Sequence, residues 1–251
     1  AYPFREWRAV PWDIVYLPGW QPMADDEPTL AEDLARAGYH TGFVTDTLPY
    51  FAPAMNFTRG FWQWEFVRGQ QQDRWRSVFA ADAARMARTR GADAPNPYNL
   101  ARYHVANTDG LLDPDRTCTA RTFQWAIRFL EDNARVPFYL LVDCFDPHEP
   151  WEAPAAYYRA YADTRHDGQT IVHARYDRDL AGLADAELAD MVAHYCGLVS
   201  LVDAWFGRLM DRLESLGLAE RTLVIFTSDH GTNFGDNLLR VVGKPSWALL
   251  P

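Results

Sequence analysis

Two short segments of the chain bring together side chains that can bind a metal ion or transfer a proton. The segment at 143–151 (DCFDPHEPW) holds His148 between two prolines, and the segment at 227–231 (TSDHG) places Asp229 next to His230. A carboxylate oxygen and a neutral imidazole nitrogen are both good ligands for a divalent cation, and imidazole titrates close to neutral pH, which suits a general acid. Taken singly, each segment is also compatible with a hydrogen-bonded surface histidine or a capped turn.

Strand and helix patterns alternate near the start of the chain. The β-branched and aromatic run at 13–17 (DIVYL) predicts a strand. Apolar residues at helical spacing predict a helix over 28–38, with Thr29 as its N-cap and Gly38 at its end, and GFVT at 42–45 predicts the next strand. A strand, a helix and a strand in this order predict a parallel sheet with covered faces, and hence an α/β fold.

The remaining chain continues this alternation. Further elements are predicted as a helix over 115–133, a strand over 138–145, a helix over 184–217 and a strand over 222–226. The run at 138–145 (FYLLVDCF) is apolar on both faces, which is typical of a buried parallel strand. The aromatic and arginine-rich part at 50–112 is predicted to form long loops with one helix near 78–90. Both chemical segments therefore follow strands, at the edge where functional groups collect in open α/β sheets.

Composition excludes several kinds of partner. The formal net charge is −10 and no basic block occurs, so neither nucleic acid nor an anionic membrane surface is an expected partner. No stretch approaches the roughly 18 apolar residues that a membrane-spanning helix needs. Cys118, Cys144 and Cys196 are widely spaced and are predicted to be buried free thiols. Without an internal repeat or a linker, residues 1–251 are predicted to form one domain.

Several stretches of this chain occur in an order that is specific in combination. They are 28–47 (PTLAEDLARAGYHTGFVTDT), 56–70 (NFTRGFWQWEFVRGQ), 137–154 (PFYLLVDCFDPHEPWEAP), 201–237 (LVDAWFGRLMDRLESLGLAERTLVIFTSDHGTNFGDN) and 243–245 (GKP). Together they resemble the sulfatase family of the alkaline phosphatase-like superfamily. The resemblance implies an α/β sandwich whose mostly parallel central sheet has helices on both faces.

The resemblance also implies roles for individual residues. Asp229 and His230 match two metal ligands, so Ca2+ or Mg2+ is the expected ion. His148 matches a histidine that contacts the sulfate ester near its leaving oxygen, and Lys244 matches a lysine that binds sulfate. The family's nucleophile is a formylglycine made from the Cys or Ser of a C-x-P/A-x-R motif. Such groups suit the chemistry, because charge on the transferring oxygens must be met by a metal ion and fixed cations.

The sequence departs from the family's pattern near its start. Neither the expected pair of aspartates at the end of a first strand nor the nucleophile motif is found. Asp25-Asp26 precedes a predicted helix and is interpreted as capping it, and the segment at 118–121 (CTAR) has its arginine one residue too early and falls in a predicted helix. AYPFREWR at 1–8 resembles the stretch that follows the nucleophile motif, and the chain ends soon after GKP. We therefore expect a fragment truncated at both ends, without the C-terminal subdomain and inactive alone.

A second departure concerns the cations. At 45–51 (TDTLPYF) many relatives carry a Lys or His that binds sulfate, whereas this chain has Asp46, Leu48 and Pro49, so that cation is missing or supplied elsewhere. Lys244 is the only lysine in the chain, and it stands where the resemblance requires one.

The resemblance implies a sulfuric ester hydrolase that acts on a small sulfated substrate, an aryl or sugar sulfate. Two alternatives stay open: a phosphomonoester, phosphodiester or phosphonate hydrolase of the same superfamily, and a non-catalytic protein that binds an anion. The aromatic stretch at 56–76 either lines a substrate pocket or packs as a loop. The sequence does not specify the substrate, the oligomeric state or the localisation, whether cytoplasmic, periplasmic or secreted.

Overall fold

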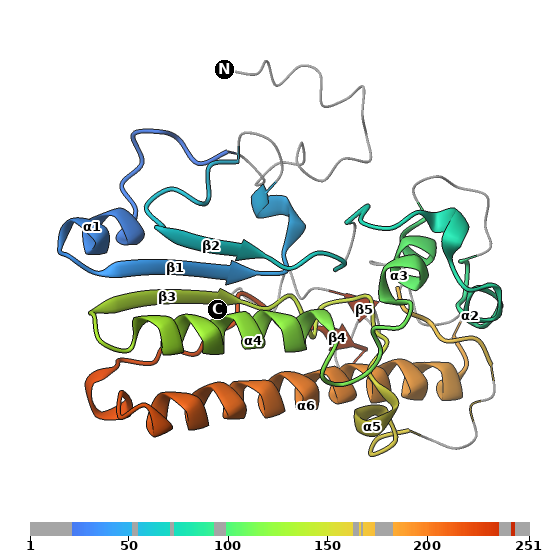
Figure 1. Cartoon of the computed structure of the whole chain (residues 1–251). Coiled ribbons are helices and arrows are strands. Elements are labelled where there is room, and N and C mark those ends of the chain that lie inside the picture. The colour runs from blue at the N-terminus through green and yellow to red at the C-terminus, as the bar shows by residue number, and fades with distance from the viewer. Residues whose placement is uncertain are drawn as a thin grey trace.

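The computed structural model describes residues 22–51, 55–70, 73–92, 99–162, 166, 168–173, 183–235 and 242–243. Its helices are α1 (Leu30–Arg36), α2 (Ala83–Arg88), α3 (Leu100–Thr108), α4 (Cys118–Asn133), α5 (Ala155–Tyr158) and α6 (Asp185–Ser215). Its strands are β1 (His40–Thr45), β2 (Gln63–Phe66), β3 (Phe138–Asp143), β4 (Asn233–Phe234) and β5 (Val242–Gly243) (Figure 1). The strand predicted at 13–17 lies outside the described residues.

The central element is a parallel sheet with the order β2-β1-β3. Its register places Thr45 of β1 beside Phe66 of β2 and Asp143 of β3, so the three strands end at the same level. In Figure 1 the three arrowheads point the same way and end close together. The predicted α/β class with a parallel sheet is confirmed. The short strands β4 and β5 form a separate antiparallel pair.

Helix α4 covers one face of this sheet, and α6 packs against α4 (Figure 1). The contact with β1 depends on Gly42, because a Cβ atom there would lie 2.3 Å from the ring of Phe129. The same ring stacks on His40, with centroids 5.8 Å apart. Between α4 and α6 lies the main core, which includes Phe123, Trp151 and other buried side chains. Within the described parts of the chain, no helix has the length and apolar character needed to cross a membrane.

The opposite face of β1 is covered by aromatic side chains. Phe43 contacts the rings of Tyr50, Phe51 and Phe61 at centroid distances of 6.0, 6.1 and 5.1 Å. Tyr50 and Phe51 belong to the 3-10 helix Leu48–Phe51, which follows the end of β1. The ring of Phe57 packs on Tyr50, with centroids 4.9 Å apart. For Phe57 and Phe61, the packing interpretation of the aromatic stretch therefore holds.

Thr29 starts α1 with a reciprocal pair of hydrogen bonds. The backbone N–H of Glu32 donates to the Thr29 hydroxyl (3.1 Å), and the Thr29 N–H donates to the Glu32 carboxylate (3.2 Å). This capping box satisfies N–H groups that the first turn leaves without helical partners. The helix was predicted to start at this cap and to end at Gly38, whose φ of 89° confirms the left-handed end.

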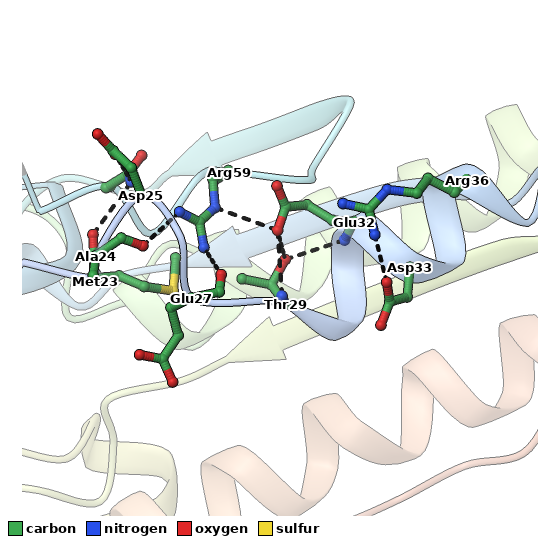
Figure 2. Close-up of polar contacts among 10 residues, drawn as sticks. Met23, Ala24, Asp25, Glu27, Thr29, Glu32, Asp33, Arg36 and Arg59 are labelled. Carbon is green, nitrogen blue, oxygen red and sulfur yellow. Dashed lines mark hydrogen bonds and ion pairs between the residues drawn. The ribbon is translucent and has the colours of Figure 1, made fainter.

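Arg59 fixes the segment that leads into α1 (Figure 2). Its guanidinium donates to the carbonyl oxygens of Ala24 (2.6 Å) and Glu27, and its Nε lies 3.4 Å from the Glu32 carboxylate. Asn56 donates from Nδ2 to the Asp25 carboxylate (3.0 Å). The proposed capping role of Asp25-Asp26 is therefore wrong for Asp25, because Thr29 is the N-cap and Asp25 binds this neighbouring turn instead.

Several elements differ from their predicted bounds. The helix predicted near 78–90 is divided into the 3-10 helix Val78–Ala80 and α2, because Ala81 is extended and Asp82 caps α2. The helix predicted from 115 begins at Cys118, since the Thr117 side chain caps it. Strand β2 and helix α3 lie in the part that was predicted to be mostly loop.

The strand predicted at 222–226 is not formed. The structure assigns these residues no strand, and Leu223, Ile225 and Phe226 are 85%, 77% and 71% exposed. The prediction of a fully buried β3 is also wrong: Leu141 is 38% exposed and most of the strand is half-buried. Among the described residues β3 has a paired strand on one side only, which is consistent with its partial exposure.

We predict that Gly42→Ala destabilises the protein. The added Cβ meets the Phe129 ring, and overpacking of this kind costs about 1–3 kcal/mol. The measurement is the free energy of unfolding in urea. Gly207→Ala is the matched control, because nothing lies within 4 Å of its added Cβ and alanine favours the α6 helix by up to about 1 kcal/mol. Equal stability of Gly42→Ala and the wild type would contradict the packing.

We further predict that Ile225→Lys reduces self-association of the 251-residue chain. The exposed side chains at 223–226 offer a hydrophobic patch, in a stretch that the structure assigns to no strand. Static light scattering against protein concentration measures the effect. Leu30→Lys makes the same chemical change at an exposed apolar side chain in α1 and is expected to leave the scattering unchanged. An unchanged signal for Ile225→Lys would show that this run does not drive association.

Candidate active site at the carboxyl ends of the strands

Asp143 closes β3 and is held by hydroxyl groups from the end of β1. The Thr45 and Thr47 hydroxyls both donate to its Oδ2, each at 2.6 Å, and the Thr47 N–H donates to the Thr45 hydroxyl at 2.9 Å. Parallel pairing of β1 and β3 makes this possible, since it places Thr45 beside Asp143. The ends of the two strands are therefore joined through side chains as well as through the backbone.

Asp146 lies three residues further on and is almost fully buried. Gln70 donates to its Oδ1 at 2.7 Å, and the hydroxyl of Thr119 in α4 donates to its Oδ2. Burial raises the pKa of Asp146, although these two hydrogen bonds act in the opposite direction. The loop after β3 is thus attached to α4 and to the loop after β2.

Asp46 follows β1 directly and is completely buried. Its Oδ1 accepts a hydrogen bond from the backbone N–H of Phe145 at 2.7 Å, whereas its buried Oδ2 has no hydrogen-bond partner. Burial, together with the negative charges of Asp146 and Asp143, raises the pKa of Asp46 well above its usual range. The position therefore favours the neutral form of this carboxyl group.

His148 lies in the loop after β3, with a side chain that is 13% exposed. Its Nδ1 lies 2.9 Å from the carbonyl oxygen of Glu149 and 3.1 Å from the Glu149 carboxylate. Both oxygens are acceptors, so Nδ1 carries a proton and Nε2 is the nitrogen suited to exchange a proton with a substrate. The ring also packs on Phe145, with centroids 4.3 Å apart. The sequence did not single out Glu149, although an acid next to a candidate histidine is a usable signal.

The segment at 227–231 meets the loop after β3. The rings of His148 and His230 lie edge to face with centroids 5.8 Å apart. Burial raises the pKa of Tyr50, and the charges of Asp143 and Asp229 act in the same direction, which places this tyrosine within the influence of both carboxylates. The structure therefore brings together His148, Asp229 and His230, the three candidates that it describes.

The Asp229–His230 pair has a donor set that suits a divalent cation. His230 Nδ1 lies 2.9 Å from the Gly231 carbonyl oxygen, so Nδ1 carries the proton and Nε2 is the nitrogen that can bind a metal. The Asp229 side chain is 88% exposed. Within the described parts of the chain, however, no group of three or more His, Cys, Asp or Glu side chains is placed to hold an ion. The pair by itself supplies fewer ligands than a calcium ion needs.

The remaining predictions concern Lys244 and the three cysteines. Lys244 lies outside the described residues. Cys118 begins α4, where its sulfur contacts Arg121 (3.3 Å) and burial raises the pKa of its thiol, so it is not an activated nucleophile. Burial also raises the pKa of the Cys144 thiol. All three cysteines are free, although only Cys118 is fully buried.

A second polar group lies beside this site and was missed by the sequence analysis. The Glu152 carboxylate is 2.7 Å from both His104 Nε2 and Arg85. Burial alone would raise the pKa of Glu152, but the hydrogen bond from His104 and the charges of His104 and Arg85 lower it to about 2. A small cavity lined by Gln70, His104, Asp146 and Glu152 lies between this group and the carboxylates described above. His104 and Arg85 come from α3 and α2, elements that the sequence did not define accurately.

The sequence matches one protein-family model along most of its length. The sulfatase family model matches residues 6–248, so the chain belongs to the sulfatase family.

Among characterised relatives, the multifunctional alkaline phosphatase superfamily protein PehA of Trinickia caryophylli is 30% identical over 139 residues, which cover 45% of this chain and 27% of PehA. An endo-4-O-sulfatase of Bacteroides thetaiotaomicron is 30% identical over 138 residues, which cover 51% of this chain and 26% of that enzyme. Both matches thus span about a quarter of the relative's length.

Solved structures support the same fold. The phosphonate monoester hydrolases of Agrobacterium radiobacter and Silicibacter pomeroyi both superpose with a TM-score of 0.57, at 20% and 21% sequence identity. Each comparison covers 88% of this chain and 50% of the other. The alkaline phosphatase-like architecture is thereby confirmed.

We predict that the 251-residue chain binds calcium weakly. Asp229 and His230 provide two ligands, whereas calcium takes about 6–8 oxygen ligands in tight sites. Isothermal titration calorimetry measures the affinity, and Asp229→Asn is expected to remove the remaining heat of binding. Tight binding by the wild-type chain would contradict the two-ligand interpretation.

Proposed function

We propose that this chain forms the hydrolytic domain of a metal-dependent sulfuric ester hydrolase whose substrate is a small aryl or sugar sulfate. The observation that carries the proposal is the approach of two histidines that are 82 positions apart in sequence: the rings of His148 and His230 lie 5.8 Å apart at the carboxyl end of a parallel sheet. Membership of the sulfatase family and the similarity to an endo-4-O-sulfatase favour sulfate as the group transferred.

Each candidate has a defined task in this proposal. Asp229 and His230 Nε2 would be two of the ligands of a Ca2+ or Mg2+ ion, which would supply positive charge opposite the oxygens of the ester. His148 holds a proton at Nε2 and delivers it to the leaving oxygen, while its Nδ1–H stays bonded to the Glu149 carbonyl. Lys244 binds the sulfate group as a fixed cation. The family's formylglycine nucleophile is expected in the complete protein.

A second candidate is hydrolysis of a phosphate or phosphonate ester at the same site. The 30% identity to PehA, whose name describes a multifunctional protein, favours it. A non-catalytic protein that binds an anion is the third candidate and differs from the others by the absence of turnover.

The test is an assay of the complete gene product with calcium, using an aryl sulfate, an aryl phosphate and an aryl phosphonate. We predict that the sulfate is turned over fastest and that His148→Ala lowers kcat/KM by about 10²–10⁴-fold, the usual contribution of a general acid. Asp229→Ala is expected to lower activity further at low calcium concentration. Asp132→Ala removes an exposed carboxylate on α4 and serves as the control.

Three outcomes separate the candidates. Faster turnover of the phosphate or phosphonate would move the assignment to the second candidate. Equal activity of the wild type, His148→Ala and Asp229→Ala would contradict the site. Binding of inorganic sulfate without turnover of any ester would support the third candidate, a non-catalytic protein that binds an anion.

A further inference from the structure

Asp46 connects β1 to the loop that carries His148. Its Oδ1 accepts the backbone N–H of Phe145 at 2.7 Å, and the Phe145 ring packs on the His148 ring with centroids 4.3 Å apart. Two contacts therefore lead from a completely buried side chain at the end of β1 to the candidate general acid. Asp46 itself is too deeply buried to contact a substrate.

The surroundings of Asp46 contain several acids and few positive charges. Asp143 and Asp146 face it from the end of β3 and the following loop, and the thiols of Cys144 and Cys118 lie within its electrostatic influence. The described side chains that donate hydrogen bonds to Asp143 and Asp146 are neutral, namely Thr45, Thr47, Gln70 and Thr119. In the described regions, neither lysine nor arginine forms an ion pair with any of the three aspartates.

These surroundings favour the protonated form of the Asp46 carboxyl group over the ionised form. Burying an ionised carboxylate without a paired charge costs far more than burying a neutral acid, for which an unpaired polar atom costs about 1–3 kcal/mol. A proton on the partnerless Oδ2 leaves Oδ1 as a carbonyl-type acceptor for the Phe145 N–H.

We propose that Asp46 is a positioning residue that, as a neutral carboxylic acid, holds the loop carrying His148 in place. The inference rests on the proposed function, because only that function gives His148 a role in the reaction. It assigns position 46 a task other than binding the sulfate, which is the task that the resemblance associates with this segment.

The first experiment measures hydrogen exchange at the Phe145 amide in the complete protein. Asp46→Asn keeps an oxygen acceptor and is expected to keep the protection of this amide. Asp46→Ala removes the acceptor and is expected to reduce protection about tenfold, the equivalent of one hydrogen bond. Asp132→Asn, an exposed change of the same chemistry, is the control. Unchanged protection in Asp46→Ala would overturn the positioning role.

The second experiment measures unfolding free energy against pH for the wild type and Asp46→Asn. A folded-state pKa raised above the unfolded value of about 3.9 means that stability is lost as pH rises through the folded-state pKa. We expect the wild type to lose stability relative to Asp46→Asn from about pH 4 upward. Asp146 is present in both proteins, and its charge acts on Asp46, so the difference reports Asp46 together with its coupling to Asp146. A relative gain by the wild type with rising pH would show an ionised Asp46 and overturn the proposal. This test needs only the asparagine variant, so it remains decisive if Asp46→Ala does not fold.

The third experiment separates kcat from KM on the ester that the wild type hydrolyses. A displaced His148 loop is expected to lower kcat of Asp46→Ala by about 100-fold with little change in KM, whereas Asp46→Asn retains activity. Equal loss in both variants, with native circular dichroism, would overturn the neutral-acid role. If the wild type hydrolyses no ester, the proposed function fails, while the exchange and pH experiments still decide whether Asp46 holds the loop in its neutral form.

Discussion

The parallel pairing of β1 with β3 is the constraint on which the site depends. Because Thr45 lies beside Asp143, the residues that follow the two strands emerge at one edge, and the carboxyl groups of Asp46, Asp143 and Asp146 lie within electrostatic reach of one another there. Such a concentration of acids would repel if all were ionised. Hydroxyl, amide and backbone donors instead fill most of the acceptor positions, so the folded chain tolerates the acids through hydrogen bonding and protonation.

The sequence was most informative where local chemistry decides the structure. The Thr29 cap, the left-handed Gly38 and the apolar faces of α4 and α6 all act within a few residues, and each was predicted. The end of β3 could also be identified as a place for chemistry, because apolar residues there give way to Asp143 and then to His148. The two chemical segments were expected at one edge of the sheet, and the structure places their histidine rings in contact.

Other features depend on partners that no local pattern specifies. Whether the run at 222–226 forms a strand depends on pairing with a neighbouring strand, and in the described part of the chain the run is not paired. Asp46 looked like a missing cation in the sequence; only the fold shows that its carboxyl group binds the backbone of Phe145, 99 positions away. The Glu152 group likewise joins residues from α2 and α3 that are remote from it in sequence.

The contacts of Arg59 give a geometric reason for arginine, rather than lysine, at this position. One guanidinium donates hydrogen bonds to two backbone carbonyls and forms an ion pair with a carboxylate, which its planar shape allows. An ammonium group is a compact point charge on a flexible stem and does not span the same three oxygens. Exchange for lysine would keep the charge but leave a carbonyl of the turn without its donor. At this turn the preference for arginine is a matter of shape, and a substitution that is conservative by charge is not conservative by structure.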